Sequence, residues 1–122
     1  MKKNTYLILS ILLAIPLFTL TSQATKVIYL HEQIAKKTTK AWEPFLSQFI
    51  GKGNVILTFY AGYCNPCKNL APAIDNLSQS MSDFTFVKAQ WELFPNLVTK
   101  YSITSIPTLI FLRDGKVVAE KP

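Results

Sequence analysis

Both cysteines of this 122-residue chain, Cys64 and Cys67, lie within one four-residue window. The preceding segment, residues 54–60 (NVILTFY), is nearly all apolar and rich in β-forming residues, as expected of a strand covered on both faces. The following segment, residues 65–80, repeats apolar side chains at helical spacing and predicts a helix. The two sulfur atoms therefore lie where a buried strand leads into a helix, which favours an α/β fold.

The remaining segments continue this alternation. Pro44 indicates a boundary or a first turn within the helical region 32–50, and Pro95 suits the first turn of a short helix. The expected order, β-α-β-α-β-α-β-β, predicts one domain in which helices flank a central mixed sheet and the final hairpin forms an antiparallel edge. We expect the other strands at residues 25–30, 84–90, 108–112 and 116–120, and the other helices at residues 32–50 and 94–103.

The amino terminus has a different composition. Two lysines precede an apolar run over residues 6–20, and the small-residue pattern SQA ends at Ala24, which is the layout of a secretory signal peptide. We therefore expect a signal peptide at residues 1–24 and a folded domain at residues 25–122. The alternative is an uncleaved membrane anchor that leaves the domain facing the periplasm. That run, however, is shorter than the ~20 residues a spanning helix needs, and it contains Pro16.

Composition and charge exclude two further classes of protein. A hydrophobic content of 49% is too high for a disordered chain. Cleavage after Ala24 would remove Lys2 and Lys3 and lower the formal net charge from +6 to +4. The remaining basic residues are scattered except at residues 36–40 (KKTTK), where they suit a solvated helix face without a stacking surface. We therefore expect no nucleic-acid partner.

Three interpretations compete for the cysteine pair. A structural disulfide would close a tiny loop and remove little entropy from the unfolded chain. A closed zinc site needs four ligands, whereas the chain offers two thiolates and the distant His31, which we expect to face solvent, so we expect no metal. A cysteine–histidine hydrolase would leave the second cysteine unexplained. The third interpretation is a dithiol that cycles between reduced and oxidised states.

The position of Cys64 suits this third interpretation. The start of a helix directs unsatisfied N–H groups and a partial positive charge at the sulfur, which favours the thiolate. Pro66 is tolerated in a first helical turn because its missing donor costs no hydrogen bond there. Cys67 lies one turn further on the same face. Thiol–disulfide exchange requires this geometry: Cys64 attacks a partner disulfide, and Cys67 resolves the mixed disulfide.

Two segments resemble signatures of the thioredoxin superfamily. Residues 59–72 (FYAGYCNPCKNLAP) are similar to its active-site segment, and residues 101–116 (YSITSIPTLIFLRDGK) are similar to its second signature. The resemblance implies a thioredoxin fold over most of the chain. It also implies that Ile106-Pro107 is a cis-proline dipeptide facing the dithiol, and that Lys88 is a buried lysine on the middle strand.

This dipeptide is expected to bind the substrate. A cis bond before Pro107 turns the chain sharply, and proline has no N–H, so the backbone of Ile106 would remain free to pair with an extended substrate segment. The alternative is that Pro107 only starts an edge strand.

The chain also departs from the family pattern. Thr58 replaces a buried acid, so the proton of the resolving cysteine would have to leave by water or another route. Tyr63 replaces a tryptophan and keeps an aromatic lip, and Asn65 replaces a glycine. Pro66 is retained next to Cys67, which favours a reducing or intermediate potential. The sequence stops at VVAEKP, where the family adds a helix, so we expect this C-terminal helix to be missing.

The resemblance implies a thiol–disulfide oxidoreductase of the bacterial cell envelope, a reductant rather than an oxidant. It implies protein disulfide substrates, a membrane thiol reductant as recycling partner, a periplasmic location and no cofactor. The alternative function is a redox-inert module of the same fold that binds peptides, against which the intact cysteine pair argues. The expected site comprises the catalytic Cys64 and Cys67, the supporting Tyr63, Asn65, Pro66 and Lys88, and the substrate-binding Ile106 and Pro107.

Overall fold

The computed structural model describes residues 27–35 and 42–122. The predicted signal peptide and the lysine cluster at residues 36–40 lie outside the described residues. None of the helices in the described ranges combines the length and apolar character that crossing a bilayer requires. In chain order the elements are β1 (Ile28–Tyr29), α2 (Leu30–Ala35), α3 (Trp42–Ile50), β2 (Asn54–Tyr60), α4 (Asn65–Ser80), β3 (Phe84–Gln90), the 3-10 turn η1 (Trp91–Leu93), α5 (Pro95–Lys100), β4 (Thr108–Arg113) and β5 (Lys116–Lys121).

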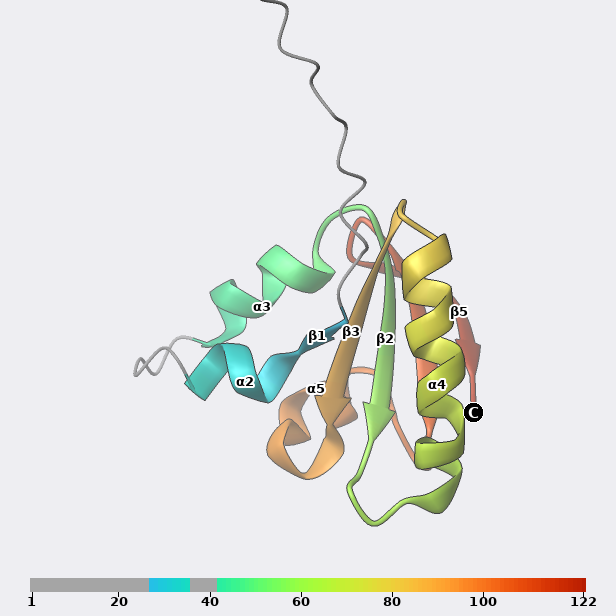
Figure 1. Ribbon diagram of the computed structural model, residues 1–122. Coiled ribbons are helices and arrows are strands. Elements are labelled where there is room, and N and C mark those ends of the chain that lie inside the picture. The colour runs from blue at the N-terminus through green and yellow to red at the C-terminus, as the bar shows by residue number, and fades with distance from the viewer. Residues whose placement is uncertain (1–26, 36–41) are drawn as a thin grey trace, which may run out of the picture.

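Five strands form one mixed sheet in the order β1-β3-β2-β4-β5 (Figure 1). Strands β1, β3 and β2 run parallel, and β4 runs antiparallel to both of its neighbours, β2 and β5. The five inner residues of β2 are all buried, as expected of a central strand covered on both faces. The predicted α/β architecture, a mixed sheet flanked by helices with an antiparallel hairpin at one edge, is confirmed.

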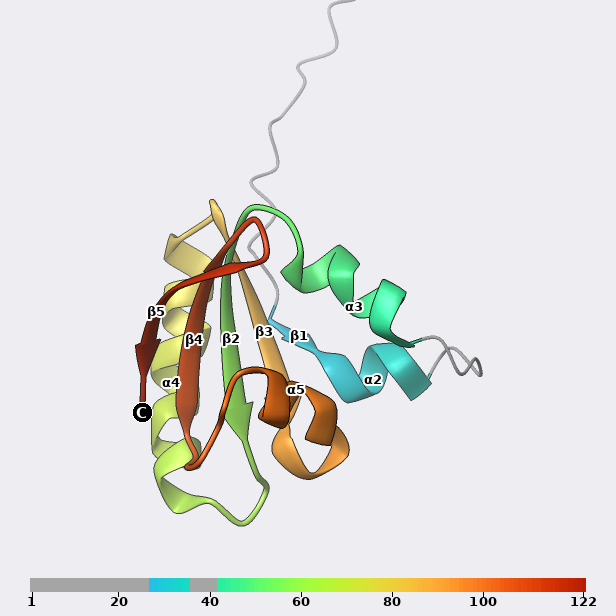
Figure 2. The same cartoon turned by 180° about the vertical axis from the view of Figure 1, so that it is seen from behind.

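Each face of the sheet has its own core. Helix α4 lies in front of the sheet in Figure 1 and behind it in Figure 2. Because side chains alternate along a strand, Ile56 of β2 packs on this face with Phe86 of β3 and Ile74 of α4. Leu57 belongs to the larger core on the opposite face, with buried residues of α2, α3 and α5. The sheet is therefore the middle of three layers.

The amino-terminal elements differ from the prediction. Strand β1 has only two residues, and Leu30 begins α2 instead of ending the strand. The side chain of Leu30 is fully buried in the larger core. The helix predicted at residues 32–50 is two helices, α2 and α3. Pro44 lies in the first turn of α3, where a missing N–H leaves no hydrogen bond unmade.

Helix α5 is shorter than the predicted 94–103 because a distinct turn ends it at Lys100. The Ser102 amide donates to the Thr99 carbonyl oxygen across 3.1 Å, and the Ile103 amide donates to the Val98 carbonyl oxygen across 2.9 Å. Ser102 has a left-handed φ of 53°. These are the bonds of a Schellman motif, which satisfies carbonyls at a helix end and redirects the chain. The segment after it leads to Pro107.

Helix α4 and the final hairpin agree with the prediction. The helix begins at Asn65, continues through Pro72 and ends at Ser80. Strands β4 and β5 each extend one residue beyond the predicted ends. All six residues of β5 are exposed.

Candidate active site

A disulfide joins Cys64 and Cys67 at the start of α4, with their Cα atoms 5.2 Å apart. Cys64 is the N-cap of the helix, and its sulfur accepts a hydrogen bond from the Cys67 amide nitrogen across 3.2 Å. Asn65 and Pro66, between them, are exposed in the first turn. Because a helix N-terminus carries free N–H groups and a partial positive charge, the Cys64 sulfur occupies a position where negative charge is stabilised.

Both cysteines are largely enclosed. Cys64 is 7% exposed and Cys67 is 8% exposed. They form a small cluster against which the partly buried side chains of Tyr60, Trp91 and Ile106 pack. Only a small part of the Cys64 side chain is therefore accessible from solvent in the disulfide form. The sequence predicted a reactive sulfur at this position but did not predict the enclosure.

An aromatic pair flanks the dithiol. Tyr63, the residue before Cys64, is 67% exposed, and its hydroxyl oxygen accepts a hydrogen bond from the indole nitrogen of Trp91 across 3.0 Å. Tyr63 was predicted at this position from the sequence, whereas Trp91 was not. The available signal was topological, because Trp91 directly follows β3, and the carboxyl ends of the parallel strands β2 and β3 meet at one edge of the sheet.

The Ile106–Pro107 peptide bond is cis, as the family resemblance implied. Ile106 packs against the cysteine cluster, and Pro107 lines a cavity that also reaches Cys67. The structure thus brings the two sequence motifs, separated by about forty residues, to one place. Their expected role in binding substrate stays a prediction.

Lys88 and Thr58 lie behind the dithiol on neighbouring strands. They are register partners on β3 and β2, and their side chains are 6% and 4% exposed. The Lys88 amine nitrogen donates to the Tyr29 hydroxyl oxygen across 3.4 Å and lies 5.3 Å from the centre of the Tyr29 ring. Lys88 is buried as the resemblance implied, although β3 lies beside the central strand rather than at the centre. Tyr29 was not predicted from the sequence to lie at this site.

Tyr60 completes this region from the end of β2. Burial raises the pKa of its hydroxyl above 10.0, and electrostatic interactions with Tyr29, Glu32 and Glu92 raise it further. The Tyr60 ring lies edge-on to that of Tyr29, with ring centres 6.3 Å apart. Both tyrosines line the same cavity.

His31, which was predicted to face solvent, is partly buried and partly open to solvent. Because β1 ends early, residue 31 enters the first turn of α2, and the side chain is partly buried. Its Nδ1 atom is buried and has no hydrogen-bond partner within the described residues. No group of three or more His, Cys, Asp or Glu residues in the described ranges could hold a metal ion.

Comparison with known proteins decides the family. The family model described as Thioredoxin matches residues 33–121. The chain belongs to the thioredoxin family. Thioredoxin from Mycoplasmoides gallisepticum is 40% identical over 67 residues, which span 55% of this chain and 67% of that protein. Thioredoxin from Bacillus subtilis is 39% identical over 80 residues, which span 65% of this chain and 77% of that protein.

Solved structures support the fold of this thioredoxin family member. The crystal structure of a thioredoxin from Nicotiana alata aligns with a TM-score of 0.67 at 23% identity, covering 82% of this chain and 83% of that one. The thioredoxin from Trypanosoma brucei brucei aligns with a TM-score of 0.66 at 19% identity, covering 84% and 82%. At sequence identities this low, the two alignments are evidence for the fold alone.

Family membership and the Cys64–Cys67 pair together make this protein a thiol–disulfide oxidoreductase. Thioredoxins act on protein disulfides. In such an exchange a thiolate attacks one sulfur of a disulfide, a mixed disulfide forms, and the second thiol displaces the bound partner. The helix cap at Cys64 and the one-turn spacing of Cys67 provide the two sulfurs that these steps require.

Proposed function

We propose that this protein works in the bacterial cell envelope as a reductant of disulfides in exported proteins. Three features support the proposal. The pattern of residues 1–24 is that of a signal peptide. Pro66 is retained beside Cys67, which favours a reducing or intermediate potential. The observation that best supports the proposed chemistry is the position of the Cys64 sulfur at the N-cap of α4, where it accepts a hydrogen bond from the Cys67 amide nitrogen.

The proposed reaction begins with the reduced dithiol. The Cys64 thiolate attacks a substrate disulfide, forming one S–S bond to the substrate while the other substrate sulfur leaves as a thiolate. The Cys67 thiolate then attacks the Cys64 sulfur, closing the intramolecular disulfide and releasing the second substrate sulfur. Two electrons pass from the dithiol to the substrate, and a membrane thiol reductant returns them to Cys64–Cys67.

Insulin reduction with dithiothreitol tests the activity. The wild-type protein should increase the rate above that of the reagent alone, and Cys64→Ser should abolish the increase. Without dithiothreitol, the reduced Cys67→Ser variant should instead accumulate a mixed disulfide with insulin through Cys64, visible as added mass. Lys116→Met, on the remote and exposed β5, is the control and should match the wild type. A wild-type protein that gives no rate increase but still binds peptides would support the redox-inert module instead.

The equilibrium reduction potential against glutathione tests the direction of electron flow. Reference values span ~−270 mV for thioredoxin to ~−120 mV for a strong oxidant. We expect the Cys64–Cys67 pair in the lower half of this span. A potential at the oxidising end would contradict the reductant role and leave the exchange activity intact.

Expression of the full-length chain in a bacterium tests the location. We expect a periplasmic product whose mass corresponds to a chain that starts at Thr25. Rapid alkylation of the cells should trap its cysteine pair mainly in the reduced form. Leu12→Arg, which places a charge within the apolar run, should keep the precursor in the cytoplasm. A membrane-bound product that retains residues 1–24 would indicate an anchor instead of a cleaved signal.

A further inference from the structure

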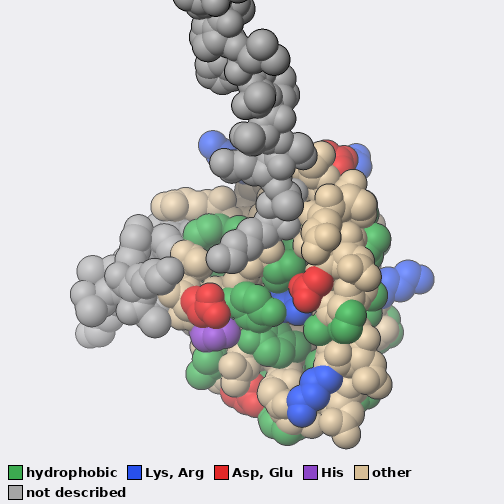
Figure 3. Space-filling view, in the orientation of Figure 1, with side chains coloured by type: hydrophobic (Ala, Val, Ile, Leu, Met, Phe, Trp, Pro, Cys, Tyr) green, Lys and Arg blue, Asp and Glu red, His purple; other side chains and the backbone are tan. Residues whose placement is uncertain are grey.

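A cavity of about 180 Å³ lies between α4 and the sheet. An apolar cavity of about 150 Å³ holds a benzene ring, so this space has room for a molecule of similar size. In the space-filling view, hydrophobic side chains surround a hollow on the α4 side, with a basic side chain visible among them and an acidic one beside it (Figure 3). The cavity is lined by Tyr29, Thr58, Tyr60, Ala61, Gly62, Cys67, Lys68, Leu70, Ala71, Ile74, Lys88 and Pro107.

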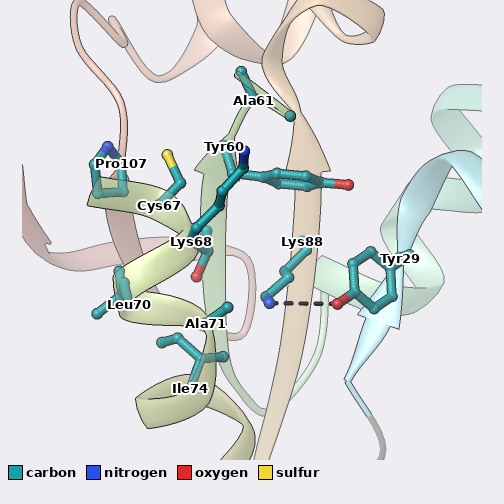
Figure 4. Close-up of a pocket in the computed structure, with 12 residues that line it drawn as sticks. Tyr29, Tyr60, Ala61, Cys67, Lys68, Leu70, Ala71, Ile74, Lys88 and Pro107 are labelled. Carbon is teal, nitrogen blue, oxygen red and sulfur yellow. Dashed lines mark hydrogen bonds between the residues drawn. The ribbon is translucent and has the colours of Figure 1, made fainter. Parts of the chain in front are cut away.

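The sheet side of the cavity carries a row of polar side chains. Lys88 of β3 is the register partner of both Tyr29 on β1 and Thr58 on β2, and all three line the cavity. Directly paired residues of neighbouring strands project from the same face of a sheet, so the row faces α4. The Lys88 and Tyr29 side chains point toward each other and away from Cys67 (Figure 4).

The α4 side of the cavity is apolar. Leu70, Ala71 and Ile74 line it, and Ile74 belongs to the core beneath the helix. No carboxylate lines the cavity within the described residues. The cavity therefore has an apolar wall on the helix and a wall of hydrogen-bond donors on the sheet.

Lys88 is an unusual residue to find in such a wall. It is 6% exposed, and lysine is almost never this buried without a partner. Its recorded contacts among the described residues are the hydroxyl and the ring face of the neutral Tyr29, and no carboxylate pairs with it there. A buried cation without an anion is costly, so a negative charge placed beside Lys88 would be stabilised.

The contact between Lys88 and Tyr29 leaves donors free for such a charge. The Lys88 amine nitrogen donates to the Tyr29 hydroxyl oxygen across 3.4 Å. An ammonium group has further N–H donors, and a hydroxyl that accepts a hydrogen bond can still donate its own proton. One carboxylate can therefore accept from both side chains, and hydrogen bonds that involve ionised groups are the stronger ones.

We propose that this cavity binds a small amphipathic monocarboxylate. The carboxylate lies between Lys88 and Tyr29, and the apolar part of the ligand packs against the α4 wall. A purely ionic ligand such as phosphate would gain nothing from that wall. The site is separate from the sulfur chemistry of Cys64, so the inference does not rest on the proposed function.

Two probes that differ in charge and share a ring test the site. Isothermal titration calorimetry at pH 7 compares benzoate with benzamide on the oxidised protein. Benzoate should bind at least about tenfold more tightly, the effect of one hydrogen bond to a charged group. Because a ligand of the folded chain stabilises it by mass action, thermal melts should also rise with benzoate concentration.

Three substitutions separate the parts of the site. Lys88→Met removes the cation and should lower the benzoate affinity to that of benzamide. Tyr29→Phe removes one donor and keeps the ring, so it should cause a smaller loss. Ala71→Leu fills the apolar part without changing a charge, and it should weaken both probes by the same factor.

Two remote substitutions are the matched controls. Lys116→Met removes the same charge from exposed β5, and Tyr101→Phe removes a tyrosine hydroxyl from the opposite core. Neither should change the affinity for benzoate. A loss in Lys116→Met equal to that in Lys88→Met would show attraction to the net charge alone and overturn the inference.

The remaining outcomes also decide the inference. Wild-type protein that binds neither probe, or binds both equally, would overturn it, because the cavity would then hold water only or any ring of this size. Phosphate binding as tight as benzoate binding would contradict the amphipathic ligand. Where circular dichroism shows Lys88→Met to be unfolded, Tyr29→Phe decides by the presence or absence of a smaller preference for benzoate. Failure to reduce insulin would contradict the proposed function and leave this site unaffected.

Discussion

The indole nitrogen of Trp91 donates a hydrogen bond to the hydroxyl oxygen of Tyr63 across 3.0 Å. The bond links the residue that follows β3 to the residue that precedes Cys64. Trp91 is also packed against the cysteine cluster, whereas Tyr63 is 67% exposed. The hydrogen bond therefore links the exposed Tyr63 side chain to a residue that packs against the enclosed dithiol.

Substitution of this pair should reveal a measurable coupling. Trp91→Phe and Tyr63→Phe each remove one partner of the bond and keep an aromatic ring. In a double-mutant cycle, the free energies of unfolding should show a coupling of about 0.5–1 kcal/mol, the usual net value of a hydrogen bond. Urea denaturation measures it. Additive effects of the two substitutions would mean that the bond contributes nothing to stability.

Ser102→Gly should stabilise the protein. Ser102 adopts a φ of 53° at the end of α5, a conformation in which glycine has no side-chain penalty. We expect a gain of about 0.5–1 kcal/mol, after allowing for the greater freedom of glycine in the unfolded chain. For a domain of this size, a thermal melt should move upward by roughly 2–8 °C.

A serine-to-glycine substitution at a position without positive φ is the control. Ser82 is also exposed but is not among the non-glycine residues with positive φ. Ser82→Gly should therefore be neutral or slightly destabilising. Equal gains at both positions would show that relief of backbone strain is not the cause.

Asp114→Ala should destabilise the turn between β4 and β5. The Asp114 carboxylate accepts from the Gly53 amide across 2.9 Å, and the Asp114 amide donates to the Gly53 carbonyl across 2.9 Å. Asp114 also has a φ of 49°, which aspartate and asparagine tolerate better than alanine. The expected loss is about 1–2 kcal/mol in urea denaturation. Asp114→Asn keeps both features and should stay within about 0.5 kcal/mol of wild type.

Alkaline pH should reduce stability through two tyrosines. Burial raises the pKa of Tyr101 above 10.0, and burial with nearby charge raises that of Tyr60. As pH rises, the unfolded chain releases these protons first, so the free energy of unfolding decreases from about pH 10 upward and is unaffected below it. Tyr101→Phe removes one contribution. The difference in free energy of unfolding between the wild type and Tyr101→Phe should be constant below about pH 9 and change above pH 10. A difference that stays constant at every pH would contradict the role given to Tyr101.

The sequence by itself determined the α/β class, most strand positions and the location of the dithiol. Residues 54–60 predict a strand because they are nearly all apolar and rich in β-forming residues, as a doubly covered strand requires, and β2 occupies that range. Asn65 begins α4 as predicted because the constraints are local: a cap residue, a proline in the first turn and helical spacing. Local backbone preferences and periodicity are encoded within a few residues, so a single sequence reveals them.

Only the tertiary structure decided which distant residues surround that dithiol. Strand β1 ends at Tyr29, beside Lys88, and the buried Leu30 already belongs to α2, which places His31 on a helix. Trp91 reaches Tyr63 because β2 and β3 are parallel neighbours whose ends coincide. Such contacts depend on strand order and register across the whole sheet. No local pattern encodes them, because the residues that meet are far apart along the chain.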